Sequence, residues 1–345
     1  MRNSKQMKAE SLESRICLAA SAVVDDGDLV ISGDAEGDIE IVAVGAGLYQ
    51  VSEGGVVIAD SSELQGVTDD IRISLEETIE ATNDNVTIDL GEEVVDRIYA
   101  DLGEGDNSLT VTGGSARSFF YRGGDGADDV QLSTTIDSWA WVRLRDGDDT
   151  LTVDGDIGRL YVAAGGGDDM VFLTDTSTLD YASLRLGNGD NEVVHSGSID
   201  GRLRVAAGDG DDIVTIDENA TVEGNVHLRL GDGANTATVN GILGGSFSFT
   251  GRDGDDTLTV AQSADVADNI YARLGEGDNS ASIEATVGAD VNVTSTNSDD
   301  ETRISVTEGS VAGDVNLTPG EQSAGYYHFR SGRGRIFRAF RFARR

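Results

Sequence analysis

One glycine recurs at nearly constant spacing through the middle of this chain. It is the second glycine of a Gly- and Asp-rich turn, as in RGGDGADDVQ at 122–131, and successive copies are 20 to 23 residues apart. Because no copy is replaced by another residue, we expect positive φ there, or close contact with the next copy. A repeat of this length predicts a solenoid with one coil per repeat. The nine turn glycines are Gly105, Gly126, Gly147, Gly167, Gly189, Gly210, Gly233, Gly254 and Gly277.

Residues on both sides of the turn glycine alternate between apolar and polar, which is the pattern of half-buried strands. In one coil, Leu151 and Val153 follow the turn, Ile157 lies midway, and Leu160 and Val162 precede the next turn. Each coil is therefore expected to hold two strands, a short bend with one inward side chain, and a Gly-Asp turn. We predict an all-β protein, a parallel β-solenoid (β-helix or β-roll) of about 21 residues per coil.

A second pattern has a period of two coils. Three residues before the turn glycine, large and small residues alternate without exception, which leaves each leucine room between small neighbours in a closely packed interior. The series is Leu102, Gly123, Leu144, Ala164, Leu186, Ala207, Leu230, Gly251 and Leu274.

The repeat divides the chain into four parts. Residues 1–24 read as an export leader, 25–82 as a degenerate N-terminal β cap, 83–310 as the Gly-Asp repeat solenoid, and 311–345 as a linker with a basic, aromatic tail. The cap holds strand-like segments, such as DIEIVAV at 38–44, that lack the Gly-Asp turn. We expect it to cover the exposed edge of the first coil.

The leader has basic residues ahead of a short apolar run, ICLAASAVV at 16–24, which includes an Ala-Ser-Ala triplet. This order is typical of an export signal and predicts a secreted or cell-surface protein. SLESRICLAA at 11–20 also resembles the leader motif of many exported proteins of planctomycete bacteria. The alternative is a plain N-terminus without a targeting role. Cys17 is the only cysteine, so no disulfide framework or zinc site is expected.

The formal net charge of −38 narrows the choice of partners. So acidic a chain is a poor partner for nucleic acid and a good one for cations. No apolar run has the length of a membrane span, so no transmembrane segment is expected. The chain has three histidines, its only lysines are Lys5 and Lys8, and its acids belong to the repeat. We therefore predict that the protein is not an enzyme.

Two residues after the turn glycine, each repeat has Asp or Asn. This position has the parity of the core residues, so its side chain should turn inward beneath the turn, whereas the aspartates one residue after the glycine, such as Asp148 and Asp168, should point into water. The inward residues are Asn107, Asp128, Asp149, Asp169, Asn191, Asp212, Asn235, Asp256 and Asn279.

Such a column of carboxylates needs a source of stabilisation. Two charges about 4.8 Å apart repel by about 1 kcal/mol in water and by several times more when they are shielded from it. Asn relieves part of this repulsion, and carboxylates with turn carbonyls form the all-oxygen site that Ca²⁺ prefers. We therefore expect Ca²⁺ at these nine residues. Ordinary polar turns that bind no specific ion are the alternative.

GGDGADDVQ at 123–131 and AGDGDDIVT at 207–215 resemble the GGxGxDxUx nonapeptide of the RTX, or hemolysin-type, calcium-binding repeats. The resemblance covers the turns of about residues 102–283. It implies a parallel β-roll in which the inward Asp and carbonyls of adjacent turns hold Ca²⁺. RTX nonapeptides follow one another directly, whereas this chain has one per coil. We therefore expect one calcium column at most, with fewer and weaker sites.

Two outward-facing rows complete the pattern. Arg143, Arg185, Arg229 and Arg273, four residues before the turn glycine, are expected to neutralise neighbouring carboxylates, with an anion-binding stripe as the alternative. Aromatic residues six residues before the glycine, with one tryptophan beside them, predict a platform for sugar rings or a partner protein, unless they simply suit strands. They are Tyr99, Phe120, Trp139, Trp141 and Tyr161.

These observations favour an exported, calcium-stabilised β-solenoid that acts as a structural or adhesive protein of the cell surface. The alternative is a β-helix protein that binds or cleaves polysaccharide, because paired acids can serve glycoside cleavage. The tail, 325–345, has seven arginines and no acid, and its apolar residues recur at helical spacing. We expect it to contact the anionic envelope or to act as a sorting segment. The alternatives are a tail that binds the acidic rod of a neighbouring molecule and a tail that is disordered.

Overall fold

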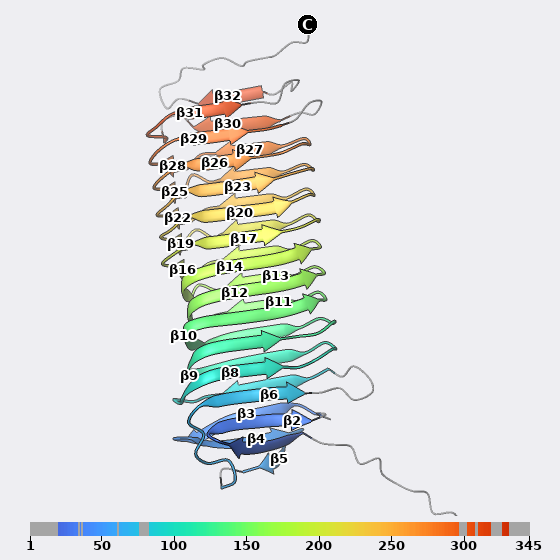
Figure 1. Cartoon of the computed structure of the whole chain (residues 1–345). Helices are drawn as coiled ribbons and strands as arrows, with labels where there is room; N and C mark the ends of the chain where they lie inside the picture. The colour runs from blue at the N-terminus through green and yellow to red at the C-terminus, as the bar shows by residue number, and fades with distance from the viewer. Residues whose placement is uncertain are drawn as a thin grey trace, which may run out of the picture.

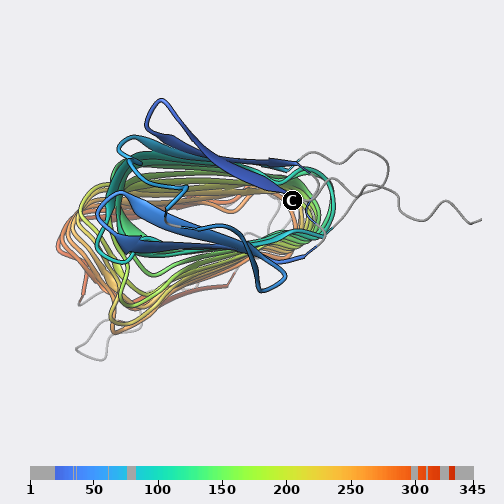
Figure 2. The ribbon, with the colours of Figure 1, turned by 90° about the horizontal axis from the view of Figure 1, so that it is seen from below.

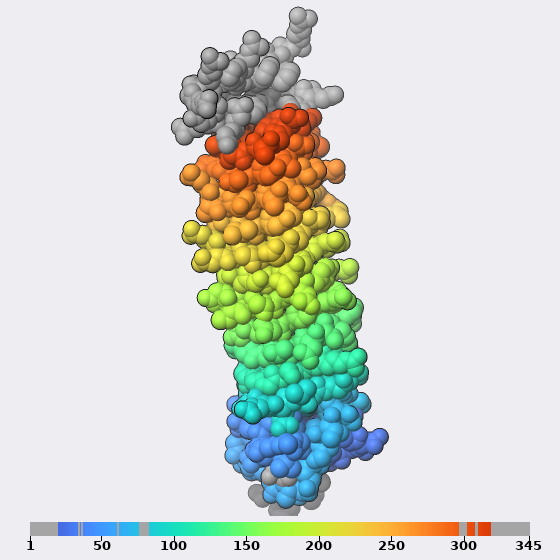
Figure 3. All heavy atoms as spheres, turned by 90° about the vertical axis from the view of Figure 1, so that its left-hand side faces the viewer, coloured from blue at the N-terminus to red at the C-terminus, as the bar shows by residue number. Residues whose placement is uncertain are grey.

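The computed structural model describes residues 20–33, 35, 37–60, 62–75, 83–296, 302–307 and 310–318, and the backbone of 326–330. These residues contain 32 strands and no helix. The strands stack into a parallel β-solenoid of about 11 turns, so the predicted fold class is confirmed (Figure 1). Seen from the side, the molecule is an elongated rod (Figure 3). The basic residues of the leader and the arginines of the tail lie outside the described side chains.

Two long sheets run the length of the rod, one on each side of the interior (Figure 2). In the repeat region, one is built from strands that follow a Gly-Asp turn, here called post-turn, and the other from strands that precede one, here called pre-turn. Strands of the coils before Gly105 and after Gly277 extend the same two sheets and are named with them. β9 (Ser108–Arg122) and β10 (Asp129–Asp146) are long enough to contribute to both. The other post-turn strands are β7 (Asn85–Asp89), β11 (Thr150–Val153), β13 (Met170–Leu173), β15 (Glu192–His195), β18 (Ile213–Ile216), β21 (Thr236–Val239), β24 (Thr257–Val260), β27 (Ser280–Ile283), β30 (Arg303–Thr307) and β32 (Tyr326–Arg330).

The pre-turn sheet carries most of the outward features discussed below. Short bend strands join it to the post-turn sheet. The other pre-turn strands are β6 (Asp70–Leu75), β8 (Val94–Asp101), β12 (Asp156–Gly166), β14 (Thr178–Asn188), β17 (Leu203–Ala207), β20 (Val226–Gly231), β23 (Phe247–Gly251), β26 (Ile270–Arg273), β29 (Val291–Thr294) and β31 (Val315–Thr318). The bend strands are β16 (Ser198–Ile199), β19 (Thr221–Val222), β22 (Ile242–Leu243), β25 (Asp265–Val266) and β28 (Thr286–Val287).

Neighbouring coils are in parallel register, so equivalent residues of successive repeats lie over one another. Val130 pairs with Leu151, and Leu151 pairs with Val171. Because side chains alternate across a strand, this register gathers the apolar members of every coil in one continuous core. Val130, Leu151 and Val171 are all fully buried there.

The series of large and small residues before the turns also lies in this core. Leu102, Leu144, Leu186, Leu230 and Leu274 are fully buried. Between them, Ala164 is buried and Ala207 is partly buried. The two-coil period of the sequence is therefore a packing pattern along the rod axis.

The N-terminal end has a different topology. β1 (Ser21–Asp25) and β2 (Asp28–Gly33) form an antiparallel hairpin, as do β3 (Ile39–Gly45) and β4 (Leu48–Glu53), with β5 (Val56–Ala59) beside β4. β2 then pairs in parallel with β6, and β3 with β7, so each hairpin extends one sheet of the rod. The last residues of the expected leader lie within β1.

Candidate functional site: the turn column

The Gly-Asp turns stack along one edge of the rod, and only glycine fits at their centre. The nine turn glycines have φ between 104° and 147°, a region that other residues rarely adopt. A Cβ at Gly147 would lie 2.0 Å from the carbonyl oxygen of Gly126 in the preceding coil, and one at Gly210 would lie 2.1 Å from that of Gly189. Both expected reasons for the glycine, positive φ and close approach, therefore apply.

The nine Asp and Asn side chains beneath the turns, here called the turn column, are all at most 1% exposed. Each Oδ1 accepts a hydrogen bond from the backbone N–H of the column residue in the preceding coil. Asp149 Oδ1, for example, accepts from Asp128 at 2.8 Å, and Asn191 Oδ1 accepts from Asp169 at 3.1 Å. The ladder runs without a break from the Asp84 N–H to Asn279 Oδ1. Half of each column side chain thus stabilises the stacking of the coils.

The aspartates one residue after the turn glycine, here called the outer row, are exposed as expected, but they also form a ladder. Its direction is the reverse of the first. Asp168 Oδ1 accepts from the Asp190 N–H at 2.7 Å, and Asp190 Oδ1 accepts from the Asp211 N–H at 2.7 Å. Two adjacent N–H groups of these turns are therefore satisfied by side chains, one from the coil above and one from the coil below, because the turn geometry offers them no partner in a sheet.

Asn and Asp differ at their second atom. In the Asn coils, Nδ2 donates to turn carbonyls, as from Asn107 to Gly105 O at 3.0 Å and from Asn235 to Gly233 O at 3.1 Å. In the Asp coils the corresponding Oδ2 is an acceptor, so it cannot bond to a carbonyl unless it carries a proton. It is buried and has no hydrogen-bond partner in Asp128, Asp149, Asp169, Asp212 and Asp256. Those five oxygen atoms are the least satisfied polar groups of the column.

Burial makes the ionised form of these five carboxyl groups costly. It raises the pKa of Asp128, Asp149, Asp169 and Asp256 to about 7, and that of Asp212 to about 6. Backbone hydrogen bonds and those from Asn side chains oppose this shift. A carboxylate with so high a pKa near neutral pH gains free energy from any proton or cation that reaches it.

Asp128, Asp149 and Asp169 are consecutive members of the column, whereas Asp212 and Asp256 each lie between asparagines. The run of three is therefore where negative charge is most concentrated. The Tyr121 hydroxyl is also buried, it lies beside the Asp128 carboxyl group, and burial together with that carboxylate raises its pKa. Sequence reasoning missed Tyr121, although an inward-facing tyrosine five residues before a turn glycine is unusual in this repeat.

A cation in the column would need both side-chain and backbone oxygen ligands. No three His, Cys, Asp or Glu side chains in the described part of the chain converge on a metal-sized site. The asparagines expected as ligands already use both atoms of their amides in hydrogen bonds, as Asn191 does with Gly189 O and Asp212 Oδ1. The donors that fit Ca²⁺ are the free Oδ2 atoms of the aspartates together with turn carbonyls, because both are hard oxygen ligands.

The aromatic residues form a ladder on the outer side of the pre-turn sheet. Tyr99 pairs with Phe120, Phe120 with Trp141, and Trp141 with Tyr161. The rings of Tyr99 and Phe120 are stacked at 5.1 Å and 1°, and those of Trp141 and Tyr161 are 5.6 Å apart. Tyr181 extends the ladder beyond Tyr161 at 5.6 Å. Stacked rings cover one another's faces, so the Tyr99–Phe120 pair offers mainly ring edges to a ligand.

Trp139 lies beside this ladder and is 36% exposed, whereas Trp141 is 43% exposed.

The four arginines that lie four residues before a turn glycine were expected to neutralise nearby carboxylates. They are Arg143, Arg185, Arg229 and Arg273. That prediction is wrong, because none of them forms an ion pair with an acidic side chain among the described residues.

No family model, curated protein or solved structure matches this chain. No helix in the described part of the chain has the length and apolar character needed to cross a membrane.

Proposed function

We propose that this protein is an exported, elongated β-solenoid that acts as a structural or adhesive component of the bacterial surface, with Ca²⁺ stabilising its turn column. We assign it no catalytic role, because the acids of its Gly-Asp turns recur with the coil repeat and do not single out one site. The observation that carries the calcium proposal is the set of five buried, unpartnered Oδ2 atoms.

Asp128, Asp149 and Asp169 are the residues we propose to hold the ion, with carbonyl oxygens of their turns. They supply adjacent negative charges on consecutive coils, and each retains a free oxygen after the ladder is formed. Bound Ca²⁺ would neutralise charge that burial makes unfavourable, so it would stabilise the folded rod. Outside the cell, sites that are half-saturated at 0.1–1 mM would suffice, since extracellular modules often bind Ca²⁺ in roughly this range.

Thermal unfolding of the full chain tests this proposal. Circular dichroism at pH 7.5 should show a melting temperature about 5 °C or more higher in about 5 mM CaCl₂ than in EDTA. Mg²⁺ should have less effect because it demands a stricter geometry. D128N/D149N/D169N should abolish most of the Ca²⁺-dependent rise.

The matched control is D148N/D168N/D190N, which makes the same change in net charge in the outer row and keeps its acceptor oxygens. This variant should retain the response to Ca²⁺. If the wild-type melting temperature is the same in CaCl₂ and EDTA, the calcium proposal is wrong.

Export is tested separately. An antibody to the rod is used to label intact cells that produce the full chain. Labelling only after lysis would contradict a surface role.

A further inference from the structure

The arginines of the rod are gathered on one side. Those from Arg72 to Arg273 are in the pre-turn strands or within a few residues of them. We define the arginine face as the outward positions eight, six and four residues before each of the nine turn glycines. It has 27 positions. Nine are arginine, and Asp101 is the only acid. An even distribution of the 63 acids along the chain would place about five there. The arginines of the face are Arg97, Arg122, Arg143, Arg159, Arg185, Arg202, Arg204, Arg229 and Arg273.

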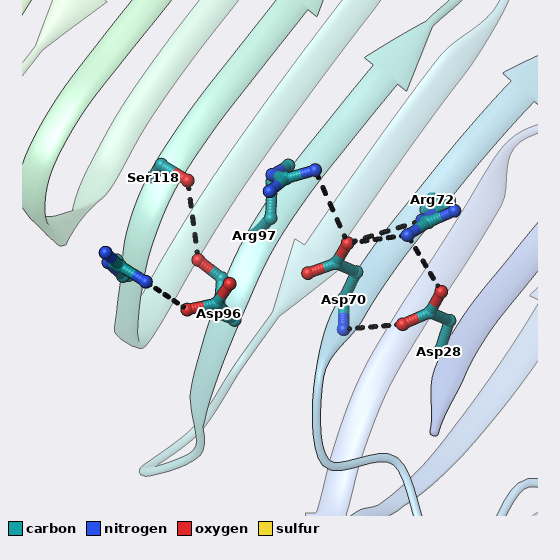
Figure 4. A network of polar contacts seen from close by, with 7 residues as sticks. Asp28, Asp70, Arg72, Asp96, Arg97 and Ser118 are labelled. Carbon is teal, nitrogen blue, oxygen red and sulfur yellow. Dashed lines mark hydrogen bonds and ion pairs between the residues drawn. The ribbon is translucent and has the colours of Figure 1, made fainter. Parts of the chain in front are cut away.

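Most of these arginines have no acidic partner. Among the described residues, the ion pairs of the pre-turn strands lie in the first coils. Arg72 contacts Asp28 at 3.0 Å and Asp70 at 2.9 Å, and Arg97 contacts Asp70 at 3.8 Å (Figure 4). Farther along, Arg122 pairs with Asp101 at 3.0 Å. Outside the arginine face, Arg117 pairs with Asp96 at 3.3 Å and Arg145 with Glu104 at 3.6 Å. No acid among the described residues lies within ion-pair distance of the other members of the face. They are Arg143, Arg159, Arg185, Arg202, Arg204, Arg229 and Arg273.

The arginines form axial rows because the coils are in register. Arg122 pairs with Arg143, which pairs with Ala163, which in turn pairs with Arg185. Beyond Arg143, the row has an arginine on every second coil, so successive guanidinium groups start from positions about 10 Å apart along the rod. Arg185, Arg229 and Arg273 are exposed. A long, regularly charged ligand that lies along the rod axis could meet all of them.

The aromatic ladder lies between the arginine rows, and a hollow opens beside it at the bend. The hollow has a volume of about 530 Å³. Trp139 lines it together with Arg97, Arg117 and Arg159, with Ser118 and Ser138, and with the acids Asp96, Asp137 and Asp180. Arg117 pairs with Asp96 at 3.3 Å and Arg97 with Asp70 at 3.8 Å, so Arg159 is the arginine of the hollow that has no ion pair among the described residues. Guanidinium groups bind carboxylates and sulfates, aromatic side chains pack on the apolar surfaces of sugar rings, and hydroxyls complete the hydrogen bonds.

We infer that the arginine face binds a polyanionic glycan, a carboxylated or sulfated polysaccharide that runs along the rod. The charge of the whole molecule favours this class over nucleic acid. Acidic side chains border the face, including the outer row at the turns and Asp96, Asp137 and Asp180 at the hollow. They would repel a dense phosphate backbone, whereas a glycan has fewer charges and uncharged hydroxyls between them. This inference names the class of ligand for the proposed adhesive role. It rests on the proposed function only in that the protein must be exported to the cell surface to encounter such a glycan.

The test is binding of the full chain to fluorescent chondroitin sulfate, which has carboxylate and sulfate groups, with neutral dextran for comparison. Anisotropy titrations at low ionic strength should show saturable binding to chondroitin sulfate that weakens as salt is added, and no binding to dextran. R143Q/R185Q/R229Q should weaken binding on the order of tenfold, since it removes three charge-assisted contacts. The titrations are done both in EDTA and in about 1 mM CaCl₂, with circular dichroism as the check on folding, so that loss of calcium binding and loss of glycan binding are distinguished.

The control variant T152E/T215E/T259E changes the net charge by the same amount on the post-turn sheet. It should bind chondroitin sulfate nearly as well as wild type. Equal weakening in both variants would show that net charge alone governs binding, and would overturn the assignment of the face. Failure of folded wild-type protein to bind chondroitin sulfate would also overturn it, as would preferential binding of a single-stranded oligonucleotide.

Discussion

Coils with aspartate in the turn column and coils with asparagine there have the same backbone ladder and differ by one atom. Asn235 uses its Nδ2 to bond its own turn, whereas Asp256 in the next coil has a buried Oδ2 with no partner. The asparagine coil is thus complete with protein atoms alone. The aspartate coil is complete only with a proton or a cation, which makes its stability responsive to the solution around it.

The two kinds of coil also differ beside the column. Three residues before the turn glycine, the asparagine coils have leucine, whereas the aspartate coils have glycine or alanine, except that Leu144 accompanies Asp149. In the glycine coils the reason is steric. A Cβ at Gly123 or Gly251 would lie 1.6 Å from Oδ2 of Asp128 or Asp256. The carboxyl group therefore occupies the space that a side chain would need.

The largest effect is expected from forcing a leucine into an aspartate coil. Gly251→Leu would place a branched side chain on the Asp256 carboxylate and between two leucine coils. It should lower the free energy of unfolding by about 3 kcal/mol or more, as overpacking does in a tight core. Urea titration followed by circular dichroism measures this change. Thr250→Leu, one residue earlier and facing outward, should change it by less than about 0.5 kcal/mol. Similar stability of the two variants would show that the alternation is not a packing requirement.

A smaller effect on stability is expected from exchanging Asp and Asn in the turn column, which replaces the Oδ2 atom by Nδ2 or the reverse. Burial raises the pKa of Asp256 to about 7, so in EDTA the folded protein keeps that proton to higher pH than the unfolded chain, whose carboxyl groups titrate near 3.9. Stability from this group is therefore complete below about pH 4 and is lost as pH rises to about 7. At pH 8, Asp256→Asn should raise the free energy of unfolding by about 1–3 kcal/mol, because Nδ2 can donate to the turn carbonyls.

Asn235→Asp is the reverse substitution and should destabilise the metal-free rod at pH 8 while having little effect near pH 4. Unfolding free energies at several pH values in EDTA check both variants. If Asp256→Asn destabilises the protein equally at pH 4 and pH 8, the free Oδ2 is not the source of the difference between the two kinds of coil.

The smallest effect on stability is expected from substitutions in the outer row. Because these side chains are exposed to water, their charge should matter little, whereas the oxygen that accepts the hydrogen bond should still contribute. Asp190→Ala removes the acceptor of the Asp211 N–H and should cost about 0.5–1.5 kcal/mol. Asp190→Asn keeps the oxygen and should be close to wild type. Thermal unfolding at fixed pH compares the two. An equal loss in both variants would mean that charge, not the hydrogen bond, accounts for the outer row.

The sequence predicted the column but not the roles of its atoms. Parity placed Asp149 and Asn191 inside the rod, and the structure has them there. Hydrogen-bond direction could not be deduced, since it depends on the stagger of one coil over the next. For the same reason, the sequence aligned Tyr99 with Phe120 but could not say that their rings would face each other. The antiparallel hairpins of the cap were also beyond it, because alternating residues suit strands of either direction.

The sequence by itself determined the coil length, the glycine at every turn and the side of the sheet on which each residue lies. A period of two residues fixes whether a side chain faces in or out, and a constant repeat fixes which residues stack. Only the tertiary structure decided which atoms find partners. In every column aspartate, Oδ1 accepts a hydrogen bond and Oδ2 has no partner. The arginines lie on one face, where few of them form ion pairs with acidic side chains. Both results depend on the distances between side chains of neighbouring coils, and the sequence of a single repeat does not give those distances.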